Sequence, residues 1–512
     1  MRAEVTAFDL PVTGRIPDHL DGRYLRNGPN PVAEVDPATY HWFSGDGMVH
    51  GVALRDGRAR WYRNRWVRTA HVCAALGEPA PGGLDPRAGM LSVGPNTNVL
   101  GHAGQTLALV EGGGANYRLT EDLDTVGTCD FDGTLFGGYT AHPHRDPRTG
   151  ELHAVSYSFG RGRRVQYSVI DTAGRARRTV DIEVSGSPMM HDFSLTDEYV
   201  VIYDLPVTFD PVQVMPADVP RWLSAPARLV VQSLLGRVQL PGPMATAMNR
   251  NRQPLHRMPY RWNDAYPARL GVMPRDGGND EVRWFDIEPC YVYHPLNAYS
   301  EIRDGAKVLV LDVVRYSRMF DRDLRGPGDT RPTLDRWTVN LTTGAVGSEL
   351  RDDRSQEFPR INEALLGRRH RFGYTVGTDG GYPSDGASEM STGLYKHDYA
   401  TGSRRVAPLD PDLIDRRDVL RAQPGRRPRR RGGRRHPDGL RLSPRPRRRP
   451  AGVAGRPESR AGGDRAPAAA GPDGLPRQLG ARWLTRASNK LCRARFRVIS
   501  GRPNLHGGAA QP

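Results

Sequence analysis

The stretch AKVLVLDVVRY at residues 306–316 is rich in Val and Leu, and the turn dipeptide Asp304-Gly305 stands directly before it. A run of this kind, bounded by a turn signal, is typical of a buried β-strand. Similar runs lie earlier in the chain, namely LALVEGG (107–113), ELHAVSYSF (151–159) and EYVVIYDLPV (198–207). The runs predict strands in both halves of the chain.

Turn signals separate these runs along residues 1–400. Asp-Gly dipeptides recur and suit tight hairpin turns, and four examples are Asp21-Gly22, Asp56-Gly57, Asp132-Gly133 and Asp304-Gly305. Strand-like segments continue for some 400 residues with few helical stretches. That is too long for one sandwich and favours an all-β array such as a propeller, although no clean sequence repeat is visible.

One segment differs from this pattern. Residues 218–245 place Trp, Leu and Val side chains among three arginines, which suits a short amphipathic helix. Two interpretations stay open: a lid or peripheral contact with a membrane surface, and a helix packed on the propeller's own face.

Charge divides the chain in two. The whole sequence has a net charge of +16, but residues 415–512 alone contain 25 Arg, one Lys and six acids, whereas residues 1–414 carry a net charge of −4. The basicity is therefore no nucleic-acid footprint of the main domain, and no nucleic-acid partner is predicted. The N-terminus lacks the apolar core of a signal peptide, no run of about 18 apolar residues exists, and the four cysteines form no C-x-x-C pair. The prediction is a cytoplasmic protein.

Three histidines adjoin strand-like runs. His142 lies in YTAHPHRDPRTGELHAVSY, His191 in SPMMHDFSLTDEYVVIYDLP and His294 in EPCYVYHPLNAYSE. Taken singly, each is well explained as an ordinary hydrogen-bonded histidine. The gaps of 49 and 103 residues would suit about one and two propeller blades of roughly 40–50 residues each. Ligands from different blades can then converge on the central axis.

Seven ordered motifs give the chain a resemblance to a known family. They are LDGRYLRNGPNP (20–31), HWFSGDGMVHG (41–51), TAHPHRDP (140–147), MMHDFSLT (189–196), PYRW (259–262), YHPLNAY (293–299) and QEFPRIN (356–362). In this order they resemble the carotenoid cleavage oxygenases, also described as the retinal pigment epithelial membrane protein family. That family includes bacterial apocarotenoid and stilbene cleaving enzymes and the vertebrate retinoid isomerase. The resemblance covers nearly all of residues 1–414.

The resemblance implies a seven-bladed β-propeller with iron(II) on its axis, held by four histidines that three outer glutamates orient. His142, His191 and His294 match the first three ligands, and Glu111 and Glu357 match two of the glutamates. Imidazole suits ferrous iron, and a carboxylate that accepts the far N–H of a ring fixes its tautomer. His50, His144 and His153 are expected to be structural.

The resemblance also implies the reaction. The expected activity is an iron(II)-dependent dioxygenase that uses O2 to cleave a conjugated C=C bond of a carotenoid or apocarotenoid to carbonyl products. Stilbene-cleaving relatives carry a lysine before the outer glutamate, and here that position is Val110, which favours a lipophilic polyene. The alternatives are a stilbene-cleaving dioxygenase, a retinoid-ester isomerase and a non-catalytic propeller that acts as a binding module.

The C-terminal part departs from the family. The fourth histidine, expected in a segment resembling FHGNWVPD, and the third glutamate, expected in GEMSFVPNP, are both missing. A permitted coding of residues 475–482, LPRQLGAR, gives FHGNWVPD when it is read one base later, and the same shift applied to residues 415–425 can give IGEMSFVPNP. We therefore predict that 415–512 is out-of-frame translation, disordered, and that it leaves the last blade incomplete and the activity impaired. A genuine basic tail is the alternative.

Overall fold

The computed structural model describes residues 3–407 and 496–499, apart from 9, 13, 36–39, 80–93, 136–137, 159–160, 211–258, 325, 327, 329 and 379–392. The helix predicted at 218–245 lies outside these residues, and so does all of 415–512 except 496–499.

The described residues form an all-β propeller with six blades, each a sheet of at least four antiparallel strands. The first three sheets contain β1 (Val5–Phe8), β2 (Gly22–Pro29), β3 (Gly47–Arg55) and β4 (Arg58–Trp66); β5 (Asn98–His102), β6 (Gln105–Leu109), β7 (Asn116–Leu119) and β8 (Thr125–Cys129); and β9 (His144–Arg145), β10 (Leu152–Tyr157), β11 (Arg164–Ile170) and β12 (Ala176–Glu183).

The other three sheets contain β13 (Ser194–Leu195), β14 (Tyr199–Asp204), β17 (Arg269–Pro274) and β18 (Arg283–Asp286); β19 (Tyr291–Arg303), β20 (Ala306–Tyr316), β21 (Thr333–Asn340) and β22 (Val346–Asp352); and β23 (Gln356–Arg360), β24 (Phe372–Gly377), β25 (Gly393–Asp398) and β26 (Ser403–Ala407). A hairpin of β15 (Val207–Phe209) and β16 (Tyr260–Trp262) is inserted between β14 and β17. The helices described are short: η1 (Trp42–Ser44), α1 (Ala70–Leu76), η4 (Asn279–Glu281) and η5 (Glu363–Leu365).

The sequence pattern explains which strands lie inside. β20 is a nearly continuous apolar run and is buried along most of its length, whereas the outer strand β12 alternates charged and apolar residues and is largely exposed. A strand covered on both faces by neighbouring sheets must be apolar at every position, and an outer strand need not be. Two of the Asp-Gly dipeptides, at Asp56 and Asp304, form hairpin turns in which both residues have positive φ.

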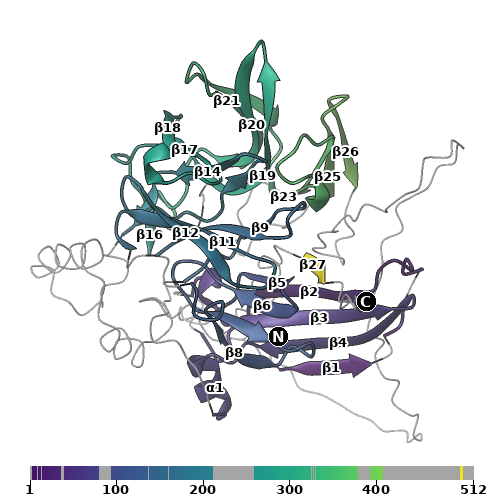
Figure 1. Ribbon diagram of the computed structural model, residues 1–512. Coiled ribbons are helices and arrows are strands. Elements are labelled where there is room, and N and C mark those ends of the chain that lie inside the picture. Colours follow the sequence, from purple (N-terminus) through teal and green to yellow (C-terminus); the bar gives the residue numbers. More distant parts are fainter. Residues whose placement is uncertain are drawn as a thin grey trace, which may run out of the picture.

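Each sheet presents one edge strand toward the middle of the molecule. In Figure 1, β5, β9, β19 and β23 lie toward the centre, and β13 contacts β19, which in turn contacts β23. β2 pairs with β3 on one side and, on the other, with β27 (Phe496–Ile499), which comes from the C-terminal segment. The largest apolar cluster of buried side chains runs from Val155 to Ile361 across the sheets that follow β9. The centre of the propeller is therefore walled by inner strands and their buried side chains.

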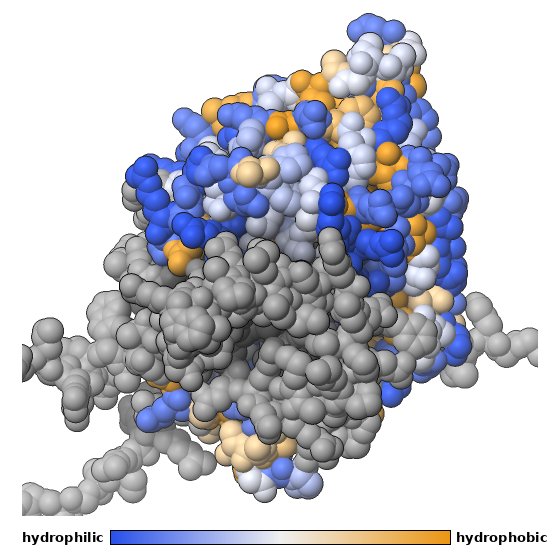
Figure 2. All heavy atoms as spheres, turned by 90° about the vertical axis from the view of Figure 1, so that its left-hand side faces the viewer, coloured by the Kyte–Doolittle hydropathy of each residue, from blue (hydrophilic) through white to orange (hydrophobic). Residues whose placement is uncertain are grey.

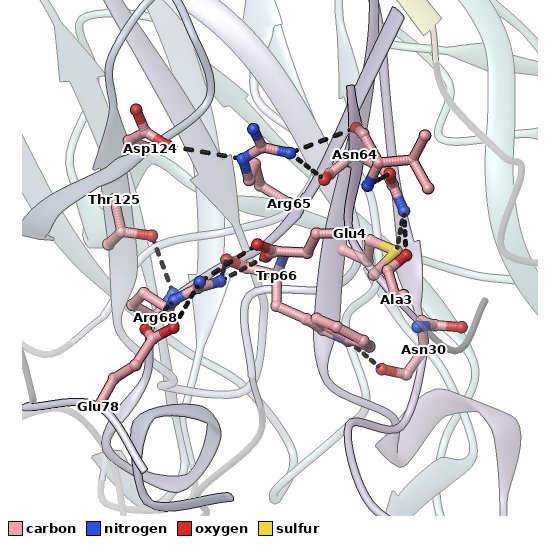
Figure 3. A network of polar contacts seen from close by, with 12 residues as sticks. Ala3, Glu4, Asn30, Asn64, Arg65, Trp66, Arg68, Glu78, Asp124 and Thr125 are labelled. Atoms are coloured by element: carbon pink, nitrogen blue, oxygen red, sulfur yellow. Dashed lines mark hydrogen bonds and ion pairs between the residues drawn. The ribbon is translucent and has the colours of Figure 1, made fainter. Parts of the chain in front are cut away.

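Side chains fasten the N-terminal strand β1 to β4 (Figure 3). The Glu4 carboxylate accepts from the Trp66 amide at 2.8 Å and pairs with the Arg68 guanidinium, which also pairs with Glu78 at 2.6 Å. The Asn64 side chain accepts from the Val5 amide at 2.7 Å. These contacts order an edge strand that is mostly exposed.

On the face shown in Figure 2, the described side chains are mostly hydrophilic, with hydrophobic ones in small scattered groups. Among the described residues, no helix has the length and apolar character needed to cross a membrane.

Candidate metal centre

The structure brings together the three histidines singled out in the sequence. His142, His191 and His294 are all buried, and one ring nitrogen from each lies within 4.8 Å of the others. The ring centroids are 4.0 Å apart for His142 and His191, 4.9 Å for His191 and His294, and 5.3 Å for His142 and His294. His142 stands just before β9, His191 just before β13, and His294 lies within β19. Three consecutive sheets thus supply one imidazole each.

The sequence spacing predicted the number of sheets correctly between His142 and His191, but not between His191 and His294. One sheet separates His142 from His191, as expected. In the described residues, one four-stranded sheet separates His191 from His294, where two blades had been predicted. The extra length belongs to the β15–β16 hairpin and the segment 211–258 between its strands. An insertion within a blade lengthens the sequence gap without adding a blade.

A β-bulge directs His294 toward the centre. The pairing of β19 with β20 shifts register between Val292 and Pro295, so that Tyr293 and His294 face a single residue of the neighbouring strand. Bulges bend a strand and redirect its side chains, and they are enriched next to functional sites. Pro295 cannot donate to the ladder and fits at such an irregular position.

Two carboxylates hold two of the rings. Both oxygens of Glu111 lie close to His191 Nδ1, at 2.8 and 2.9 Å, and Glu357 Oε2 lies 2.8 Å from His294 Nδ1. An ionised carboxylate only accepts, so each Nδ1 must carry a proton, and a ring without a second proton then has its lone pair on Nε2. The two Nε2 atoms are 3.1 Å apart. Two lone pairs cannot bond to each other, so a shared proton or a bound cation is needed where the two Nε2 atoms face each other.

A strained backbone forms the wall beside Glu357. The register of β23 against β24 shifts between Glu357 and Arg360, and Phe358 has a φ of +60° although it is bulky and precedes Pro359. A bulky residue with positive φ is an outlier, and such strain gathers at functional sites. In this conformation the Phe358 amide donates to the Glu357 carboxylate, and its ring centroid lies 5.6 Å from that of His294.

Asp192 is a residue of the site that the sequence interpretation missed. Its Oδ1 accepts from the Phe193 amide at 2.8 Å and lies 2.8 Å from His144 Nε2, while its Oδ2 lies 3.9 Å from His142 Nδ1. The carboxylate is fully buried. The signal that could have found it is its position next to His191, because an Asp in a buried inner segment needs a partner.

The remaining predicted histidines lie elsewhere. His50 is 2.8 Å from the Tyr62 hydroxyl, and His153 is 2.7 Å from the Tyr167 hydroxyl. Burial lowers the pKa of His153 to about 4, so that ring is neutral near pH 7. His50 lies in β3 and His153 in β10, and His144 lies beside Asp192, the carboxylate near His142.

Aromatic and apolar side chains surround the triad. The Tyr293 ring lies 5.0 Å from His191 in an edge-on arrangement, and Phe43 lies 6.4 Å beyond it. Val110, beside Glu111, is buried. Burial, assisted by the negative charge of Glu111, raises the pKa of Tyr157, which stays a neutral phenol. The surroundings thus suit an apolar molecule.

Comparisons with known proteins agree with one another. The sequence profile of the family "Retinal pigment epithelial membrane protein" matches residues 1–424. The "Carotenoid cleavage oxygenase" of Mycobacterium tuberculosis is 75% identical over 412 residues, which cover 80% of this chain and 82% of that protein. The "Carotenoid 9,10(9',10')-cleavage dioxygenase 1" of Arabidopsis thaliana is 30% identical, over 72% of this chain and 66% of that protein.

Two solved structures share the fold. The lignostilbene dioxygenase of Pseudomonas brassicacearum superposes with a TM-score of 0.62 at 25% identity, and cobalt-substituted Synechocystis ACO with a TM-score of 0.59 at 23% identity. Each match covers 80% of this chain and 82% of the other.

Proposed function

The chain belongs to the carotenoid cleavage oxygenase family, and from this premise we propose that it is an iron(II)-dependent dioxygenase that cleaves a conjugated C=C bond of a carotenoid or apocarotenoid. One observation carries the proposal. The Nε2 atoms of His191 and His294 face each other at 3.1 Å, and each opposite nitrogen is held by a carboxylate.

In this proposal His142, His191 and His294 hold Fe²⁺. Glu111 orients the ring of His191, and Glu357 orients the ring of His294. The donor set fits, because three neutral imidazoles are ligands that suit ferrous iron and both carboxylates impose the tautomer that a metal needs. Ferrous iron bound there would supply the centre at which O2 reacts with the alkene. The residues of the chain keep the ring nitrogens aimed at one point and, through the surrounding aromatic rings, exclude water from it.

The apolar surroundings support a polyene as the substrate. Val110 and Tyr293 offer no charge to a ligand, so a polyene would be held by burial of its apolar surface. The highly identical relative is named for carotenoid cleavage, and one structural neighbour for a lignostilbene. A stilbene is therefore the second candidate, and product masses from a carotenoid and stilbene panel distinguish the two. A peripheral membrane contact through 218–245 and a cytoplasmic location stay predictions.

We further infer that a single-base slip near codons 413–415 replaced the end of the propeller. The family profile matches residues 1–424, and the segments resembling FHGNWVPD and GEMSFVPNP, which would carry the fourth histidine and the third glutamate, do not occur beyond residue 414. A seventh blade on the same axis would come from the restored frame. β2 offers an edge for pairing, which β27 occupies here.

The experiment compares the 512-residue chain with a gene in which one base restores the frame. We expect the restored protein to contain about one iron per chain and to cleave a carotenoid, and the 512-residue chain to contain less iron and to cleave little. Equal iron content and equal activity would contradict the predicted impairment, and an unbroken frame through codon 414 in independent reads of the gene would contradict the slip. Absence of iron from the restored protein would favour a non-catalytic binding propeller, and absence of labelled oxygen from the products would favour isomerisation.

A further inference from the structure

Tyr316 is a buried residue beside the triad that no ligand or glutamate motif contains. It is the last residue of β20, it is fully buried, and it pairs across the sheet with Tyr291 at the start of β19. Its ring packs edge-on against Tyr293 at 5.7 Å. Its hydroxyl donates to Glu357 Oε1 at 3.2 Å. A tyrosine hydroxyl buried this deeply usually has a specific polar partner.

The hydrogen bond from Tyr316 is one of three contacts that the Glu357 carboxylate makes with neighbouring donors. Glu357 Oε2 faces His294 Nδ1 at 2.8 Å and also receives the Phe358 amide, while Oε1 receives Tyr316. With both oxygens engaged from different directions, the carboxylate cannot rotate about its last bond without losing a partner. A buried carboxylate that loses a donor is destabilised, so this orientation is preferred.

The glutamate of the other ring is held differently. Both oxygens of Glu111 lie within 2.9 Å of the same nitrogen, and its side chain is 16% exposed, compared with 5% for Glu357. Water can therefore assist Glu111, whereas Glu357 depends on groups of the protein. Tyr316 and His294 belong to one hairpin, β19–β20, and Glu357 belongs to the neighbouring sheet. The two hydrogen bonds thus join adjacent sheets through one carboxylate.

We propose that Tyr316 is a positioning residue of the metal centre, which holds the Glu357 carboxylate in the orientation that fixes the Nδ1–H tautomer of His294. The proposal rests on the proposed function, because it concerns the same three histidines. Tyr316 does not touch the metal or the substrate in this role. It acts through Glu357, and it predetermines the direction of His294 Nε2 before any ion arrives.

The test substitutes Tyr316→Phe, which removes one oxygen and keeps the ring, in the 512-residue chain and in its frame-restored form. The matched control is Tyr203→Phe. Tyr203 lies in the same apolar cluster, is almost as buried, and bonds through its hydroxyl to Ser194 at 2.7 Å, without touching either glutamate. Cobalt(II) is the probe, because its absorption bands report both its affinity and its ligand geometry. Denaturant unfolding of each metal-free protein monitors stability.

We expect Tyr316→Phe to weaken cobalt binding by about threefold to tenfold, less than the loss of a direct outer partner, and to shift the cobalt bands. Tyr203→Phe should leave both unchanged. Unchanged binding and bands in Tyr316→Phe, or equal changes in both variants, would overturn the proposal.

A second measurement does not need a metal. Selective ¹⁵N labelling of histidine in the metal-free protein should show His294 with its proton on Nδ1, and Tyr316→Phe should mix the two tautomers. If no unsubstituted form binds cobalt, the proposed function fails, and the tautomer of His294 alone then decides whether Tyr316 positions it. A single Nδ1–H tautomer in both proteins would reject that role.

Discussion

Glu111 is more exposed than Glu357, and this difference predicts which substitution weakens metal binding more. Glu111→Gln keeps the shape of the side chain but leaves either a weaker acceptor or an NH2 group facing His191 Nδ1–H at 2.8 Å. Loss of such a partner typically weakens metal binding by about 10- to 100-fold, or about 1.4–2.7 kcal/mol. Because Glu111 is 16% exposed, water can take part of its place, and we expect about tenfold.

Glu357→Gln should cost more, close to about 100-fold, since its side chain is only 5% exposed and the amide would also disturb Tyr316. The control is Glu121→Gln, an exposed glutamate between β7 and β8 in the part of the propeller that supplies Glu111. Affinities come from competition between frame-restored protein and a chelator for iron(II) or cobalt(II). The reasoning is refuted if Glu111→Gln binds as tightly as the unsubstituted protein, or if Glu357→Gln is affected less than Glu111→Gln.

Substitutions of Asp192, His370 and Arg68 test three further side-chain environments. Asp192→Asn, which replaces the carboxylate next to His142 with a neutral amide, should lower cobalt affinity by about threefold to tenfold, and an unchanged affinity would show that Asp192 does not act on the centre. Burial lowers the pKa of His370 to about 4, below its unfolded value near 6.5, so the unfolded state binds the proton first and stability falls as the pH drops from about 6.5 to 4. His370→Gln should therefore reduce the pH slope of the unfolding free energy in that window by up to about 1.4 kcal/mol per pH unit, and an identical slope would contradict the assignment. Arg68→Gln, which removes the partner of Glu4, should cost about 1 kcal/mol in urea unfolding and speed hydrogen exchange in β1, and a loss that salt does not reduce would argue against an ionic contribution.

The sequence alone determined the fold class and the three histidines. The Val-rich apolar run at residues 306–316, which follows the turn dipeptide Asp304-Gly305, predicted a buried strand, and β20 confirms this. The seven motifs placed His142, His191 and His294 in order, and the structure brings them within 4.8 Å. Glu111, in LALVEGG, and Glu357, in QEFPRIN, were identified from the same family resemblance, and each lies beside the Nδ1 atom of a histidine.

The tertiary structure decided what depends on contacts between distant segments. Whether 103 residues span one blade or two cannot be read from spacing, because the β15–β16 insertion adds length without adding a sheet. The contacts of Asp192 with His144 and of Tyr316 with Glu357 arise only when segments distant in the sequence meet, and no local pattern marks Tyr316. The positive φ of Phe358 goes against its local preference before a proline, and the surrounding bulge imposes it. Local sequence sets which segments become strands, but the direction in which a side chain points at the axis is set by the packing of one sheet against the next.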